Sequence, residues 1–87
     1  MQEVHYLKGL ATIRGEIDRV LADRGITADS IAVTEDGVEL PGATFTINAN
    51  GKEQGQAFTY SEIEDSGEAI DAPAATKVRM LVSHFLG

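Results

Sequence analysis

Three turn-forming dipeptides, Asp36-Gly37, Pro41-Gly42 and Asn50-Gly51, divide the middle of this 87-residue chain into short segments. Asp-Gly and Asn-Gly tolerate the positive φ angles of tight hairpin turns, and Pro-Gly favours a bend. From residue 43 to 49 apolar and polar residues alternate, which is typical of a strand with one buried face. We therefore predict an antiparallel meander, with Gly55 loosening its last turn. Its three or four strands are expected at residues 31–35, 38–40, 43–49 and 56–60.

An amphipathic helix is predicted before the meander, over residues 3–24. Arg24 in the last turn, Gly25 at a left-handed C′ position and the apolar Ile26 after it predict where this helix ends. Gly9 and Gly15 are costly inside a helix, so they indicate close backbone packing or, for Gly9, a position near the helix start. The residues of the expected core-facing stripe are Leu7, Leu10, Ile13, Ile17, Val20 and Leu21.

A second helix is predicted from Asp71 as its N-cap, with Pro73 in the first turn, where a missing N–H costs little. The segment before it, residues 61–71, has two interpretations. Ser61 and Glu64 have the spacing of a capping box, which predicts a single helical turn, and the alternative is a loop. The core-facing stripe of the second helix is expected to be Ala74, Ala75, Val78, Leu81, Val82 and Phe85.

These elements predict a single small acidic α+β domain over residues 1–87. The expected architecture is two-layered, in the order α-β-β-β-(β)-α, with both helices on one face of the sheet. We find no apolar run long enough to span a membrane and no secretory leader, so a cytoplasmic location and no membrane partner are expected.

Composition and motifs favour a protein without catalytic chemistry. The chain has no Cys, which excludes disulfides, thiolate metal ligands and a thiol nucleophile. Ser83 and His84 are neighbours, but adjacent helical residues point in different directions, so they do not form a nucleophile–base pair. Gly51-Lys52 lacks the remaining residues of a phosphate-binding loop, and Glu62 and Glu64 begin an incomplete calcium loop. We therefore predict no catalytic residues, no metal and no cofactor.

The charge is unevenly distributed along the chain. The formal net charge is −7, yet residues 25–76 contain ten acidic residues and only Lys52 as a base, a charge of −9. Two explanations compete. Acidic turns increase solubility and keep sheet edges from pairing with other chains. Alternatively, an acidic sheet-and-loop face docks on a basic surface by electrostatic complementarity. The candidate residues of that face are Asp36, Glu39, Glu62, Glu64, Asp65 and Glu68.

The second explanation suggests a protein-interaction module whose carboxylates imitate a phosphate backbone. Small acidic inhibitors encoded by phages and mobile elements, including anti-CRISPR proteins, work in this way, and this chain resembles that class in size and charge alone. Its expected partner is a basic surface of a nucleic-acid-handling protein. Direct nucleic-acid binding is not expected: the element order resembles the double-stranded-RNA-binding domain, but Asp71 at the start of the second helix would repel phosphate.

A homo-oligomeric structural component is the alternative function. On the last helix, Lys77, Met80 and His84 project to one side, away from the apolar stripe. An exposed methionine is often harmless, but it is also common at self-association surfaces. The sequence therefore offers a homodimer through this helix as the second hypothesis.

Overall fold

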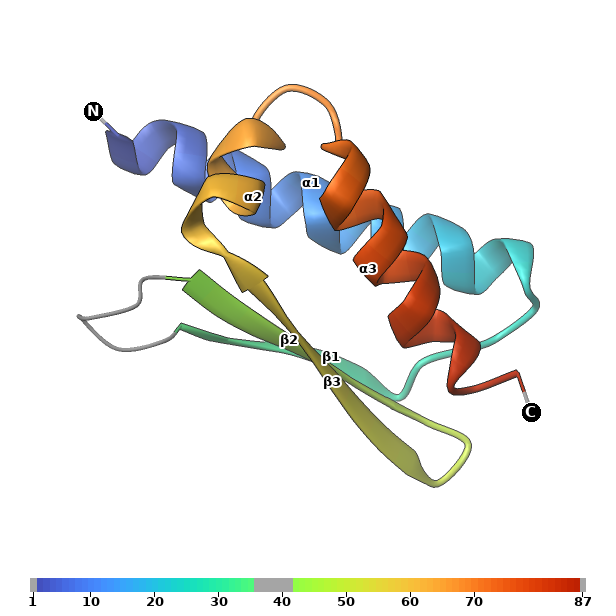
Figure 1. The fold of residues 1–87 in the computed structure, drawn as a ribbon. Helices are drawn as coiled ribbons and strands as arrows, with labels where there is room; N and C mark the ends of the chain where they lie inside the picture. Colours follow the sequence, from blue (N-terminus) through green and yellow to red (C-terminus); the bar gives the residue numbers. More distant parts are fainter. Residues whose placement is uncertain (1, 36–41, 87) are drawn as a thin grey trace.

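The computed structural model describes residues 2–35 and 42–86, and side chains from residue 5 onward. The described residues form three helices and one three-stranded sheet, which confirms the predicted α+β class (Figure 1). No helix in these ranges is long and apolar enough to cross a membrane. In chain order the elements are α1 (Gln2–Asp23), β1 (Ser30–Glu35), β2 (Gly42–Ala49), β3 (Lys52–Thr59), α2 (Tyr60–Asp65) and α3 (Ala72–Ser83).

The sheet is antiparallel with strand order β1-β2-β3, so β1 and β3 are its edges. Asn50 (φ 54°) and Gly51 (φ 77°) make the predicted tight turn between β2 and β3. The expectation that Gly55 loosens this turn is wrong, because Gly55 lies within β3, opposite Thr46. The turn predicted at Asp36-Gly37, the strand at 38–40 and Pro41 lie outside the described residues.

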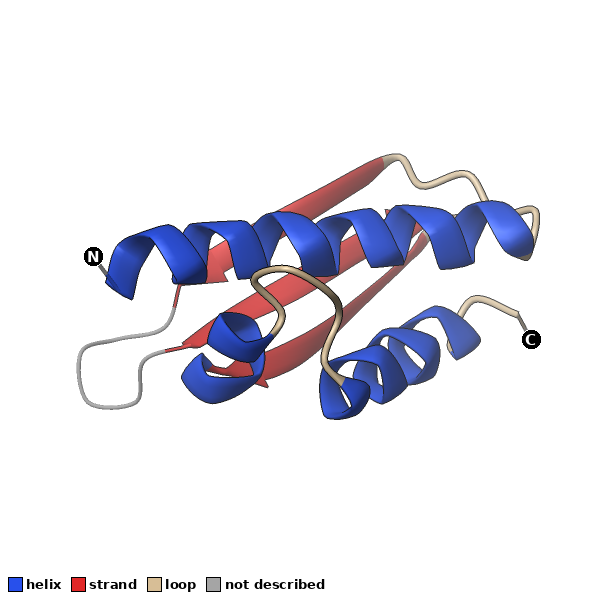
Figure 2. Ribbon diagram, turned by 90° about the horizontal axis from the view of Figure 1, so that it is seen from above, coloured by secondary structure: helices blue, strands red, loops and turns tan. Residues whose placement is uncertain are grey.

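α1 and α3 cover one face of the sheet, as predicted for the two helices, and α2 lies on the same face (Figures 1 and 2). α3 packs against β3, and α1 packs beside both α2 and α3. Phe45 and Phe58 meet edge to face at 5.4 Å between ring centroids in the centre of the core. The other fully buried large side chains are Ile13, Ile17, Ile47, Ile63, Val78, Leu81 and Val82.

α1 ends as the sequence predicts. Gly25 has φ +70°, its N–H donates to the carbonyl of Ala22, and the N–H of Ile26 donates to the carbonyl of Leu21. This is the Schellman arrangement, which satisfies carbonyls that the end of a helix leaves unpaired. The side chain of Ile26 packs against the core.

The predicted stripe of α1 is wrong at one position, since Leu7 is 61% exposed. The two helical glycines also differ. A side chain at Gly9 would overlap the carbonyl oxygen of Ile63, whereas the space beside Gly15 is open. Gly9 therefore marks close packing between α1 and α2, and Gly15 does not.

Residues 60–65 are helical, and the cap differs from the predicted one. Tyr60 begins α2 and does not end the preceding strand. The capping box is formed by Thr59 and Glu62, two residues earlier than the predicted Ser61 and Glu64. This earlier start is accompanied by full burial of Ile63 in the core.

α3 begins after Asp71, with Pro73 in its first turn as predicted. The Asp71 side chain makes no capping hydrogen bond, and its carbonyl accepts from the N–H of Ala75. Of the predicted stripe, only Ala75 is incompletely buried.

Candidate interaction surface

The end of α2 and the connection that follows it carry three carboxylates, Glu64 and Asp65 in α2 and Glu68 in the connection, which we call the acidic patch. Asp65 and Glu68 are exposed and Glu64 is partly exposed. None of the three forms an ion pair with a described residue. The ion pairs among the described residues join Arg14 to Asp18, Arg19 to Glu16 and Asp23, and Lys77 to Glu62. The connection arches over the helical layer, on the side away from the sheet (Figure 1).

The backbone under the acidic patch is held by a buried serine. Ser66 is completely buried, its hydroxyl donates to the carbonyl of Glu62 at 2.8 Å, and the same oxygen accepts from the N–H of Asp71 at 3.0 Å. The N–H of Gly67 donates to the carbonyl of Glu64 at 3.2 Å. The end of α2 and the start of α3 are thus tied together, which holds the backbone that carries the acidic patch.

Glu62 was predicted as part of the acidic face, but its carboxylate has partners within the fold. Oε1 accepts from Nζ of Lys77 at 2.6 Å and from the N–H of Thr59 at 2.8 Å. Partial burial by itself raises the pKa of Glu62, but the hydrogen bonds from Lys77 and Thr59 and the charge of Lys77 hold this pKa below its ordinary value. The negative charge of Glu62 is therefore balanced internally.

The strands contribute little to an acidic surface. On the open face of the sheet, the described strand residues include one carboxylate, Glu53. The rest of that face consists of small or polar uncharged residues, among them Thr44, Thr46 and Asn48. Asp36 and Glu39 lie outside the described residues. Within the described part of the chain, the predicted acidic residues therefore lie in α2 and in the connection after it, and not on the sheet.

The three residues predicted for self-association through the last helix are separated by the structure. The side chain of Lys77 points away from the other two residues. Its Nζ contacts Glu62, donates to the carbonyl of Ala57 at 3.1 Å and lies 5.7 Å from the centre of the Phe58 ring. Met80 is 55% exposed and His84 is exposed, so both remain on the outer side of α3.

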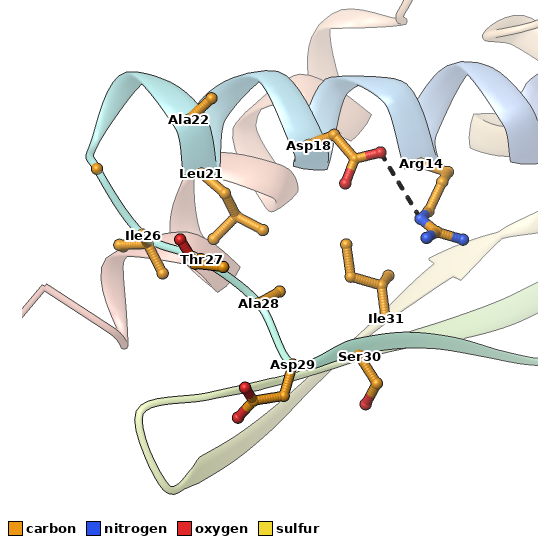
Figure 3. A pocket seen from close by; sticks show the side chains of 11 residues that line it. Arg14, Asp18, Leu21, Ala22, Ile26, Thr27, Ala28, Asp29, Ser30 and Ile31 are labelled. Atoms are coloured by element: carbon orange, nitrogen blue, oxygen red, sulfur yellow. Dashed lines mark ion pairs between the residues drawn. The ribbon is translucent and has the colours of Figure 1, made fainter.

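One feature that the sequence did not predict is a groove between α1 and β1 (Figure 3). Near Ser30 it has a volume of about 500 Å³, and it is lined by residues that include Arg14, Asp18 and Ile31. A second hollow of about 320 Å³ lies near Glu35 and is lined with Leu7. The groove follows from the strand order, because α1 leaves the edge strand β1 partly uncovered, and a local sequence pattern carries no signal for strand order.

Within residues 5–35 and 42–86, no three His, Asp or Glu side chains come together as a group that could hold a metal ion. Comparisons with protein-family models, curated proteins and solved structures give no match to this chain.

Proposed function

We propose that this chain is a non-enzymatic interaction module whose acidic patch binds a basic surface of a nucleic-acid-handling protein. The observation that carries the proposal is the acidic patch itself: three carboxylates without ion-pair partners among the described residues, on a backbone held by Ser66. In this proposal the protein acts as an inhibitor of the nucleic-acid-mimic class, as anti-CRISPR proteins do, and comes from a phage or mobile element.

The physical reason is electrostatic complementarity. Because the backbone that carries the patch is already held in place, binding does not have to order this segment, so more of the electrostatic attraction remains as affinity. Uncompensated negative charge also steers the protein toward a basic groove and speeds association. The same charge repels phosphate, so the proposed partner is a protein and not nucleic acid. A nucleic-acid-handling target also places the proposed site of action in the cytoplasm.

Capture from cells that produce the protein tests this proposal. The tagged chain is compared with a patch variant, Glu64→Gln/Asp65→Asn/Glu68→Gln, after cross-linking and mass spectrometry. A control variant, Asp23→Asn/Asp29→Asn/Glu53→Gln, removes the same number of charges at the end of α1, just before β1 and near the start of β3. The proposal predicts a basic protein that wild type and control capture, that the patch variant loses, and that duplex DNA displaces. Equal capture by all three chains would contradict it.

The second candidate function is a structural component that associates through α3. It is favoured by the 55% exposure of Met80, an apolar side chain on the outer side of that helix. Met80→Asp would abolish association in this case, and light scattering would detect the loss. Unchanged association in that variant would remove this candidate.

A further inference from the structure

We propose that two copies of this chain pair antiparallel along their β1 strands, so that the two sheets join into one across a two-fold axis. The end of β1 from the second copy then lies beside the groove, to which β1 contributes Ser30 and Ile31. The acidic patch, at the end of α2 and in the α2–α3 connection, takes no part in this contact.

The two edge strands of the sheet, β1 and β3, differ in how they are protected against pairing with another strand. On β3, the carbonyl of Ala57 accepts hydrogen bonds from Lys77 and from the side chain of Gln56, and Lys52 and Glu53 add charge to the strand. On β1, the one charged residue is Glu35 at the end of the strand, the sequence SIAVTE has no Lys and no Pro, and no described side chain hydrogen-bonds to its backbone. Charged side chains, above all lysine, together with proline and covering groups are the usual means of preventing edge pairing. β1 is therefore the edge that is open to another strand.

Apolar side chains are exposed beside the β1 edge. The residues of β1 opposite Ile47 and Phe45 are Ile31 and Val33, so both point toward the helical side. Val33 is nevertheless 40% exposed, and Ile31 is only partly buried. Figure 2 shows the reason, since much of β1 projects beyond α1 at the margin of the sheet. A strand added at this edge would cover the side chains that α1 leaves exposed.

Two copies of β1 are complementary to each other in one antiparallel register. With Ala32 on the two-fold axis, Ile31 lies opposite Val33 of the second copy, and Ser30 lies opposite Thr34. Opposite residues of an antiparallel pair share a face, so the apolar pairs fall on the helical side and the small polar pairs on the open side. Moving the axis to Val33 would place Ile31 opposite Glu35, which is unfavourable.

The ends of the paired strands limit the strength of this contact. In this register Glu35 of the second copy falls opposite Asp29, and the two-fold axis brings the same two carboxylates together at the other end. Like charges directly opposite each other weaken an antiparallel pair. Arg14 does not offset them, because Figure 3 shows it beside Ile31 and away from Asp29. The pairing therefore depends on the backbone hydrogen bonds of the open edge and on the apolar contacts of Ile31 and Val33, and a weak dimer is expected.

Sedimentation velocity on the purified chain, from about 1 µM to about 1 mM, tests the pairing. The wild type is expected to form dimers whose fraction rises with concentration. Val33→Lys is expected to be monomeric throughout this range, because it places a charge in the apolar part of the contact. Val33 is already 40% exposed, so this change leaves the buried core intact. Met80→Asp, on α3, is expected to dimerise like the wild type.

A charge substitution tests the register. Glu35→Arg places a guanidinium opposite Asp29 of the second copy and should lower the dimer dissociation constant about threefold or more. The double variant Asp29→Arg/Glu35→Arg places two cations opposite each other and should return the constant to about the wild-type value. Circular dichroism of each variant checks that it is folded. A monomeric wild type at all concentrations, dimers of Val33→Lys, or loss of dimers in Met80→Asp would overturn the pairing. A dissociation constant that Glu35→Arg leaves unchanged or raises would overturn the register with Ala32 on the axis.

Discussion

Nζ of Lys77 lies 2.6 Å from Oε1 of Glu62, and this ion pair connects α3 to the first turn of α2. Only 28% of the Lys77 side chain and 15% of the Glu62 side chain are exposed. The same ammonium donates to a carbonyl of β3 and lies over the Phe58 ring. One cation therefore joins three elements of the fold and supports the segment from which the acidic patch projects.

Replacement of Lys77 by Met is expected to lower the free energy of unfolding by about 1–2 kcal/mol, because it leaves a partly buried carboxylate without its cation. Urea unfolding measures the change, and a double-mutant cycle with Glu62→Gln isolates the coupling between the two side chains. Arg14→Met is the control, since the side chains of Arg14 and its partner Asp18 are 48% and 58% exposed. A larger loss in Arg14→Met than in Lys77→Met would contradict this assignment.

Glu62 is also expected to make stability depend on pH. Its pKa is lower in the folded chain than in the unfolded chain, because the bonds from Lys77 and Thr59 outweigh the effect of burial. Its contribution is therefore complete above the unfolded-state pKa and is lost as the pH falls through the folded-state pKa. Glu16, whose pKa is lowered by its hydrogen bond from Arg19, acts in the same direction.

Unfolding measured from about pH 6 to about pH 3 should therefore show declining stability, with a shallower decline in Glu62→Gln. Some slope is expected to remain in that variant because Glu16 is still present. Superimposable pH profiles for the wild type and Glu62→Gln would contradict the pKa argument.

Alanine at the two glycines of α1 should have opposite effects. Gly9→Ala would bring a methyl group into the backbone of Ile63, and we expect a loss of at least about 2 kcal/mol in unfolding free energy. Gly15→Ala meets open space in a helix interior and should stabilise the chain by about 0.5–1 kcal/mol. Thermal unfolding of both variants distinguishes them, and equal melting temperatures would show that α1 and α2 are not in close contact at Gly9.

The hydroxyl of Ser66 should contribute strongly to the α2–α3 connection. Ser66→Ala leaves the N–H of Asp71 and the carbonyl of Glu62 without this partner, which is expected to cost about 1–3 kcal/mol. Ser83→Ala removes an exposed hydroxyl that donates to the carbonyl of Met80, and it should change stability by less than about 0.5 kcal/mol. Unfolding of both variants at the same urea concentration would contradict the stabilising role of the Ser66 hydroxyl.

Local sequence signals predicted the parts of the fold whose geometry is decided by a few neighbouring residues. Gly25 and Asn50-Gly51 have the positive φ angles that their residue types favour. The start of α2 could not be predicted in this way, because Thr59 with Glu62 and Ser61 with Glu64 have the same capping spacing. The observed start buries Ile63 and pairs Glu62 with Lys77, and both contacts join segments distant in the sequence.

In the candidate surface, too, only the features decided by neighbouring residues could be predicted from the sequence. Exposure of Asp65 and Glu68 follows from their polar, turn-rich segment, whereas the internal pairing of Glu62 depends on where α3 packs. Leu7 fits the apolar stripe of α1, yet it lines the hollow near Glu35 and remains exposed. Helical periodicity predicts which face turns inward, but not how far along the helix the rest of the fold covers that face.

The most direct test of the proposed function is the affinity of the captured partner for the wild type, the patch variant and the charge-matched control, measured at low and at physiological salt. We predict that the patch variant binds at least about tenfold more weakly than the control at low salt, and that the difference narrows as salt screens the carboxylates. Equal affinities of the patch variant and the control at both salt concentrations would contradict a role for Glu64, Asp65 and Glu68 in binding.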